Sequence, residues 1–263
     1  MKKYLFVDEV FEIDCGKGFN GYPEFETQSD KCIAKISVGN FAEIGTSTFG
    51  VEYVSKPYAH ILRSASDGSS MLFSNDDWSE SFVCSGNNGE YSEELMITSV
   101  YSALCKFRTL FLHASVIDLN GQGIVFVGPS GIGKTTQAEL WKKVEGADIL
   151  NGDKVFIRNF DKGVFAYGSP WKGSSSYFAN KKTLLKGVVV LKQGKINRIR
   201  RVDLVEAIET FMPHVFLPHW DEECMKNALA TLDDIINVVP IWMLECQPDG
   251  EAVKITKESV LGE

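Results

Sequence analysis

The chain has 263 residues, of which 44% are hydrophobic and 24% charged, and its formal net charge is −8 at pH 7. This length and composition are typical of one large or two modest globular domains with apolar cores, and they exclude disordered and fibrous classes. The acidic balance disfavours a nucleic-acid partner, and no run of about eighteen uncharged apolar residues predicts a membrane span.

The six cysteines are scattered without CxxC spacing, so we interpret them as reduced cysteines of a cytoplasmic protein rather than as a metal site. Acidic residues follow the first apolar stretch too soon for a secretion signal. The basic stretch Lys192 to Arg201 favours a solvated strand pair over a binding groove.

Residues 1–90 contain short extended segments separated by Gly, Asn, Asp and Ser, which predicts a β-rich N-terminal region. The expected strands are Tyr4 to Val7, Ile33 to Val38, Gly50 to Val54, His60 to Arg63 and Met71 to Phe73. Ser85 to Gly89 is the expected exit loop. The sequence leaves the role of this region open, with substrate recognition as one interpretation.

Residues 91–263 predict a larger α/β part in which helices alternate with apolar strands. Its expected helices are Glu93 to Phe107, Lys134 to Val144 and two later helices that Asp203 and Asp221 would cap. Its expected strands are Leu110 to Ile117, Ile124 to Val127, Val155 to Ile157, Gly163 to Ala166, Gly187 to Leu191 and Ile241 to Glu245.

A glycine-rich loop joins the strand Ile124 to Val127 to the helix that starts at Lys134. Its pattern is that of a Walker A phosphate loop, in which small residues let backbone N–H groups surround phosphate oxygens. Lys134 would neutralise the β- and γ-phosphates and Thr135 would bind Mg²⁺. The predicted ATP-binding residues are Gly128, Pro129, Ser130, Gly131, Ile132, Gly133, Lys134, Thr135 and Thr136.

A transporter ATPase would carry the same loop, but it would also need a Leu-Ser-Gly-Gly-type signature and an apolar strand that ends in Asp-Glu. The most apolar strand after the loop ends instead in Leu191-Lys-Gln-Gly194, and no comparable glycine signature follows. The sequence therefore argues against this class.

Two further motifs accompany the loop. Leu112-His-Ala-Ser115 places His113 21 positions before Lys134, and Asn151-Gly-Asp153 follows the loop's helix. This order resembles the HPr kinase/phosphorylase family and its phosphoenolpyruvate-carboxykinase-like relatives. The resemblance covers residues 113–157 best, and it implies an α/β fold with a P-loop core and a mixed sheet.

The resemblance implies that Asp153 is the base that accepts a proton from the attacking hydroxyl, and that His113 positions the phosphate or the base. It makes Lys134 the third catalytic residue. Asp153 could alternatively join Thr135 as a Mg²⁺ ligand, since both are hard oxygen donors. A turn-forming carboxylate and a core histidine remain the structural alternatives for Asp153 and His113.

The chain also departs from the family pattern. Gly152 replaces one of two paired aspartates, and the family's Mg²⁺-binding Glu and second-site Arg are not identified, with Arg200 and Arg201 as candidates for the latter. A substrate loop is expected at Gly168 to Gly173. These departures argue against the reverse, phosphorylase reaction and do not point to the HPr protein as substrate.

We therefore expect an ATP-dependent kinase that transfers the γ-phosphate to a hydroxyl, and the expected acceptor is a serine of a peptide or protein. Some relatives of the family phosphorylate precursor peptides of small biosynthetic clusters, so the resemblance extends to a peptide acceptor. A small-molecule acceptor stays open, as do a homo-oligomeric state, a non-catalytic nucleotide-binding regulator and, more remotely, a carboxykinase-type enzyme.

Overall fold

The computed structural model of the chain describes residues 1–14, 19–40, 45–48, 51–54, 58–86, 91–173 and 175–262. Two compact units divide it, Met1–Leu104 and Cys105–Glu263. The helix that begins at Glu93 is thereby grouped with the first unit, whereas the sequence placed the change at residue 90. Part of the expected exit loop, together with Cys15 and Gly50, lies outside the described residues.

The first unit is built on a six-stranded sheet in the order β1-β2-β3-β8-β7-β6. Its strands are β1 (Lys2–Phe6), β2 (Glu9–Asp14), β3 (Cys32–Gly39), β6 (His60–Arg63), β7 (Met71–Ser74) and β8 (Glu80–Cys84). The strands β2 and β8 were not expected. The turn before β2 is Val7-Asp8 with both φ angles positive, a two-residue hairpin without the usual Asn-Gly signal.

Three smaller features complete the first unit. The strands β4 (Gly45–Thr48) and β5 (Val51–Val54) pair with each other in an antiparallel hairpin. The short helix η1 spans Pro23–Phe25. The helix α1 (Glu93–Cys105) begins where the Ser92 hydroxyl accepts a hydrogen bond from the Leu95 amide, at 3.4 Å.

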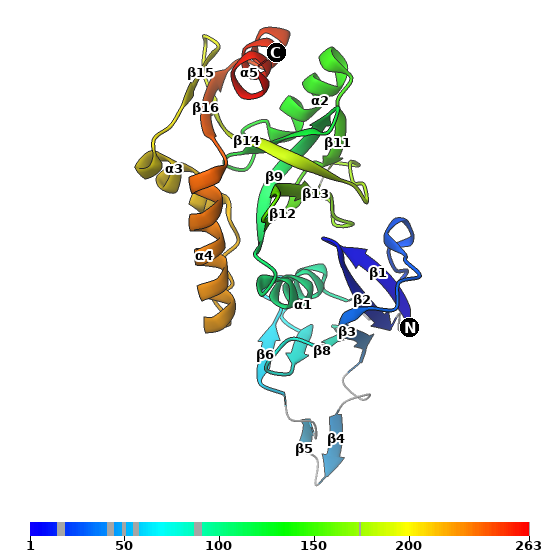
Figure 1. Ribbon diagram of the computed structural model, residues 1–263. Coiled ribbons are helices and arrows are strands. Elements are labelled where there is room, and N and C mark those ends of the chain that lie inside the picture. Colours follow the sequence, from blue (N-terminus) through cyan, green and yellow to red (C-terminus); the bar gives the residue numbers. More distant parts are fainter. Residues whose placement is uncertain are drawn as a thin grey trace. The chain divides into compact units, whose positions relative to one another are not determined.

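The second unit holds a mixed sheet in the order β10-β9-β12-β13-β14-β16-β15, with β11 paired to β9 (Figure 1). Its strands are β9 (Thr109–Leu119), β10 (Gln122–Val127), β11 (Asp148–Asn151), β12 (Lys154–Phe160), β13 (Gly163–Tyr167), β14 (Lys182–Gln193), β15 (Arg198–Arg201) and β16 (Ile241–Cys246). Because β14 also pairs in parallel with β10, five strands close into a ring. The predicted α/β class with a mixed sheet and a β-rich N-terminal region is confirmed.

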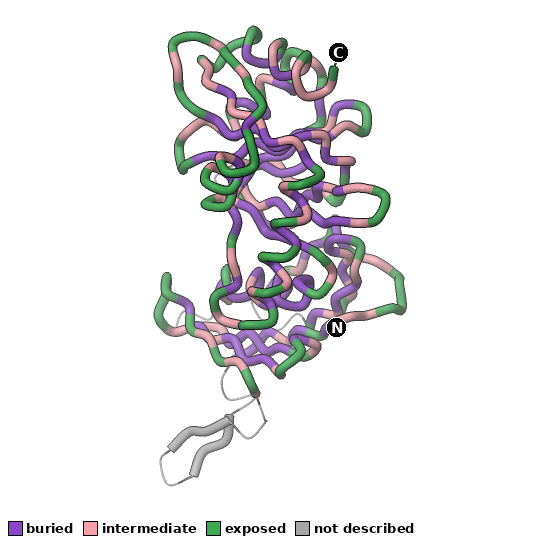
Figure 2. The backbone as a smooth tube through the Cα atoms, turned by 60° about the vertical axis from the view of Figure 1, so that its left-hand side comes forward, coloured by how far each residue is buried: buried purple, intermediate pink, exposed green. Residues whose placement is uncertain are grey.

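The side chains of this sheet pack into two apolar cores, one on each face of β9. Leu112, Ala114 and Val116 of β9 enter the core that also includes residues of α3 and α4, whereas Ile117 enters the core under α2 and α5. The helices are α2 (Lys134–Glu145), α3 (Leu204–Phe211), α4 (Glu222–Val238) and α5 (Gly250–Leu261). Buried residues run along the strands and exposed residues along the outer turns (Figure 2). His113 and Ser115 therefore lie on the α2 face of β9.

Aspartates cap three of these helices. The Asp203 and Asp221 carboxylates accept hydrogen bonds from the Glu206 and Cys224 amides, as the sequence predicted. Asp249 does the same for the unexpected helix α5. The stretch Lys192 to Arg201 forms the exposed end of β14 and most of the exposed strand β15, but the two do not pair with each other as expected, because β16 lies between them. None of the helices in the described part of the chain is long and apolar enough to cross a bilayer.

Candidate functional site

The glycine-rich loop runs from Gly128 to Gly133, between the end of β10 and the start of α2. Gly131 and Gly133 have φ angles of 77° and 110°, which L side chains rarely adopt, so glycine is required there. Pro129 and Ser130 are exposed. No side chain caps α2, because its N-cap residue is Gly133. The start of α2 therefore offers backbone N–H groups to an anion.

Lys134 is held inside this loop. Its side chain is buried, and Nζ donates to the carbonyl oxygens of Gly128, at 3.0 Å, and Pro129, at 3.3 Å. Burial lowers the pKa of Lys134, and the nearby Asp153 carboxylate opposes that shift. The Lys134 carbonyl accepts a hydrogen bond from the Ser115 hydroxyl, at 2.9 Å, which ties α2 to β9.

Asp153 lies in the turn between β11 and β12, beside His113 of β9. His113 Nε2 and Asp153 Oδ1 are 3.0 Å apart, and the Ala114 amide donates to the Asp153 carbonyl at 2.9 Å. The hydrogen bond from His113 is the largest cause that lowers the pKa of Asp153, while partial burial opposes it and the cationic Lys154 and Lys134 add to it. Asp153 is therefore an ionised acceptor that faces the phosphate loop.

Asn151 organises the turn that carries Asp153. It is fully buried, and its Oδ1 accepts from the amides of Asp153 and Lys154, both at 2.8 Å. Its Nδ2 donates to the carbonyl oxygens of Ser169, at 3.0 Å, and Trp171, at 2.9 Å. The expected substrate loop 168–173 is thereby bound to the turn, and Trp171 is buried rather than presented to a ligand.

Close backbone approaches bring this loop against Asp153 and Gly152. A Cβ at Gly173 would lie 2.5 Å from Asp153 Oδ2, and a Cβ at Gly152 would overlap the Ser175 hydroxyl. The Ser175 Oγ is buried and has no hydrogen-bond partner in the described part of the chain. The space that a side chain at position 152 would take is therefore filled by the Ser175 hydroxyl.

The hydroxyl of Thr135 points toward the same turn, since Oγ1 donates to the Gly152 carbonyl at 3.1 Å. Thr135 Oγ1 and the Asp153 carboxylate are hard oxygen donors of the kind that Mg²⁺ prefers. Among the described residues, no three His, Cys, Asp or Glu side chains gather to hold a metal by themselves. This donor set fits Mg²⁺ bound jointly with nucleotide phosphates, which is its usual mode in phosphoryl-transfer sites.

His214 is a site residue that sequence reasoning missed. Val215 pairs with Leu112 in an antiparallel bridge, and Phe216 donates its amide to the Phe111 carbonyl at 2.9 Å. The rings of Phe111 and Phe216 stack with centroids 4.7 Å apart, so the same register sets His214 opposite His113. Burial, followed by the electrostatic influence of Lys134 and His113, lowers the pKa of His214.

The arginine candidates are not brought to this site. Arg200 forms an ion pair with Glu206, and β15, which carries Arg200 and Arg201, is an edge strand that pairs with β16 and not with β9. His60 lies in the first unit, where its ring stacks on Trp78. The structure therefore gathers His113, Lys134, Thr135 and Asp153 and adds His214, but it leaves out both arginines.

Comparison with known proteins gives a distant match. No family model matches the chain. It is similar to HPr kinase/phosphorylase 1 of Oceanobacillus iheyensis, with 23% identity over 133 residues, which make up 50% of this chain and 39% of that relative. The chain thus spans about two fifths of the length of this curated relative. The resemblance noted in the sequence is confirmed as that of a divergent relative.

Among solved structures, the chain is similar to the HPr(Ser) kinase/phosphatase from Coxiella burnetii. The alignment covers 58% of this chain and 93% of that one, with a TM-score of 0.31 and 10% sequence identity.

Proposed function

We propose that the chain is an ATP-dependent kinase that transfers the γ-phosphate to a hydroxyl, most simply that of a serine in a peptide or protein. One observation carries this proposal. The Asp153 carboxylate, hydrogen-bonded by His113 at 3.0 Å, lies close enough to Lys134 of the phosphate loop for each group to shift the pKa of the other. A base beside a polyphosphate site is the minimum that phosphoryl transfer to a hydroxyl needs.

The loop would compensate the negative charge of the nucleotide phosphates. Residues 128 to 136 would surround the phosphates with backbone N–H groups, and the Lys134 ammonium would exchange its two carbonyl partners for phosphate oxygens. Mg²⁺, held by Thr135 and by the phosphates, would neutralise the charge that develops on them. A direct bond from Asp153 to the ion is the alternative to its role as base. The chemistry itself then needs alignment more than covalent help.

In the proposed reaction the acceptor oxygen attacks the γ-phosphorus while the bond from that phosphorus to the bridging oxygen breaks, so that ADP leaves with the bond electrons. The hydroxyl proton passes to Asp153. The lowered pKa of Asp153 keeps the carboxylate ionised, so that it can hydrogen-bond the hydroxyl and orient it, although it also makes the carboxylate a weaker base. His113 holds one carboxylate oxygen, Oδ1, which fixes the direction of the other toward the acceptor.

A non-catalytic nucleotide-binding regulator is the second candidate, and Gly152 favours it. The family's second carboxylate is missing there, and Ser175 occupies the space. Such a protein would keep Lys134 essential and make Asp153 dispensable. The two candidates therefore differ in what a change at Asp153 does.

The test combines labelled ATP with the purified full chain and the peptide encoded beside its gene. Wild type should transfer label, Lys134→Ala should lose ATP binding, and Asp153→Asn should bind ATP but transfer at least about 100-fold more slowly. The exposed Lys143 and Asp233 offer matched controls, Lys143→Ala and Asp233→Asn, which should behave as wild type.

Bound ATP without transfer to that peptide or to other small hydroxyl compounds would contradict the kinase assignment. A biological activity that survives Asp153→Asn but not Lys134→Ala would establish the regulator instead. A cytoplasmic location, an acceptor-recognising role of residues 1–90 and assembly into a homo-oligomer belong to the same proposal. Labelled transfer by a variant without residues 1–90 would refute the recognition role.

A further inference from the structure

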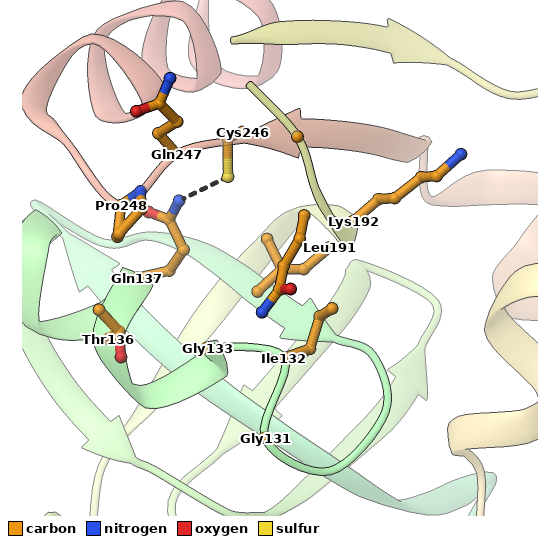
Figure 3. Close-up of a pocket in the computed structure, with 12 residues that line it drawn as sticks. Gly131, Ile132, Gly133, Thr136, Gln137, Leu191, Lys192, Cys246, Gln247 and Pro248 are labelled. Atoms are coloured by element: carbon orange, nitrogen blue, oxygen red, sulfur yellow. Dashed lines mark hydrogen bonds between the residues drawn. The ribbon is translucent and has the colours of Figure 1, made fainter. Parts of the chain in front are cut away.

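A cavity with a volume of about 410 Å³ opens beside the phosphate loop (Figure 3). Four segments enclose it: the loop, the first turn of α2, the end of β14 and the end of β16. Its lining includes Ile132, Thr136, Gln137, Leu191, Lys192 and Pro248. We call it the loop-side cavity. Its volume is in the range of small-ligand sites.

This cavity lies on the other side of the loop from Asp153. Thr135 directs its hydroxyl to Gly152, next to Asp153, whereas Thr136 and Gln137 line the cavity. Successive helical residues are about 100° apart, so Gln137 faces nearly opposite to Thr135 across α2. A nucleotide whose γ-phosphate is near Asp153 would therefore extend its other end toward the cavity.

Gln137 lines this cavity and carries a hydrogen-bonding group without a partner. Its side chain is 3% exposed, and Nε2 donates to the Cys246 sulfur at 3.1 Å. Its Oε1 is buried and has no hydrogen-bond partner in the described part of the chain. Turning the amide over would exchange the two atoms, so one of them lacks a partner in either orientation. A buried amide that lacks a partner is costly, which favours a ligand that supplies one.

The rest of the lining fits a flat ring with polar edges. Ile132, Leu191 and Pro248 provide apolar surface, and Lys192 is the charged residue among those that line the described cavity. The lining of the described cavity therefore contains no carboxylate that would repel the phosphates of a nucleotide. Burial raises the pKa of the Cys246 thiol, so the sulfur beside Gln137 stays neutral.

We propose that the loop-side cavity binds the purine nucleoside of the triphosphate, and that the Gln137 amide selects it by a hydrogen bond to the edge of the base. This inference rests on the proposed function, because it assumes that the loop binds the phosphates of the same nucleotide. It adds a specificity residue that lies outside the phosphate loop and outside the Asp153 turn.

The experiment measures binding of magnesium-ATP and of magnesium-tripolyphosphate, which has the phosphates without the nucleoside, to the full chain by calorimetry. Wild type should bind ATP at least about tenfold more tightly than tripolyphosphate. Gln137→Leu should weaken ATP binding about tenfold and leave tripolyphosphate binding unchanged, which also shows that the variant is folded. Gln28→Leu, at an exposed glutamine of the first unit, is the matched control and should change neither affinity.

The outcomes separate the two proposals. If wild type binds neither compound, the phosphate site fails and the nucleoside site fails with it. If wild type binds both compounds equally, or if Gln137→Leu weakens both alike, the nucleoside site is wrong and the phosphate site stands. CTP and UTP should bind at least about tenfold more weakly than ATP or GTP, and equal affinities would overturn the choice of a purine.

Discussion

His113 Nε2 lies 3.0 Å from Asp153 Oδ1, although His113 belongs to β9 and Asp153 to the turn before β12, 40 positions further along the chain (153 − 113). Backbone pairing holds them together, since Lys154 is opposite His113 and the Ala114 amide donates to the Asp153 carbonyl. The carboxylate is thus fixed by main-chain hydrogen bonds on one side and by an imidazole on the other.

Replacing His113 by Ala should slow phosphoryl transfer about tenfold or more while ATP affinity changes less than about threefold, because the carboxylate loses its orientation but the loop is untouched. The pKa of Asp153 should rise toward its ordinary value, since the lost hydrogen bond is the largest cause that lowers it. Kinetics and ATP titrations check this. His219→Ala, at an exposed histidine, should have no effect. A loss confined to ATP affinity would assign His113 to nucleotide binding.

Asn151→Ala should lower the free energy of unfolding by about 3 kcal/mol, because the Asp153 and Lys154 amides and the Ser169 and Trp171 carbonyls lose a buried partner. Urea unfolding measures the change. Asn237→Ala, which removes one exposed hydrogen bond on α4, should cost less than about 1 kcal/mol. Equal losses in the two variants would show that Asn151 does not organise the turn.

Gly152→Ala should destabilise the protein by about 1–3 kcal/mol, since the added Cβ would overlap the Ser175 hydroxyl. Ser175→Gly should restore most of that loss in the double variant, because the two changes act on the same space. Gly250→Ala is a suitable control, as a Cβ there would meet only Val144 at 3.9 Å. Additive losses in the double variant would contradict this account. An aspartate at position 152 would likewise fit only if the Ser175 side chain were removed.

His214 should make stability fall with acid. Its pKa is lowered from the ordinary 6.5, so the unfolded chain takes up a proton at this residue before the folded chain does. The contribution of neutral His214 is therefore full above pH 6.5 and is lost as the pH falls toward the lowered pKa. Between about pH 7.5 and about pH 5.5, wild type should lose more stability in urea than His214→Gln does.

The other groups that face His214 are Lys134 and His113, and both are the same in the two proteins. The difference between their pH slopes thus isolates His214. The variant His219→Gln should keep the slope of wild type, since that histidine is exposed. Parallel slopes for wild type and His214→Gln would show that His214 titrates alike in the folded and unfolded chain.

Local signals in the sequence determined much of the second unit. Apolar periodicity predicted α2 and α4, aspartates predicted the starts of α3 and α4, and β-branched runs predicted β9, β10 and β14. The phosphate loop was also predicted from the sequence, since its glycines and Lys134 all lie between positions 128 and 134. These features depend on residues within one or two turns of each other, so neighbouring side chains suffice to specify them.

The missed elements have weaker local signals. The strand β2 follows a Val-Asp turn, and the helix α5 begins after Gln247-Pro-Asp without a sharp apolar stripe. Neither pattern distinguishes its structure from a loop. Pairing with β1 and packing of Val253 into the core under α2 decide these two elements.

The sequence by itself determined the phosphate loop, the α/β class and the order His113, Lys134, Asp153 along the chain. Only the tertiary structure decided which distant residues contact the site. His214 is brought opposite His113 by the pairing of Val215 with Leu112, and Ser175 lies against Gly152. Gln137 contacts Cys246, which is 109 positions away. These contacts depend on the register of the paired strands and on how α2 and the distant strand β16 pack against each other. Such register is a property of the whole packed core, whereas a turn or a helix start is specified by its neighbours.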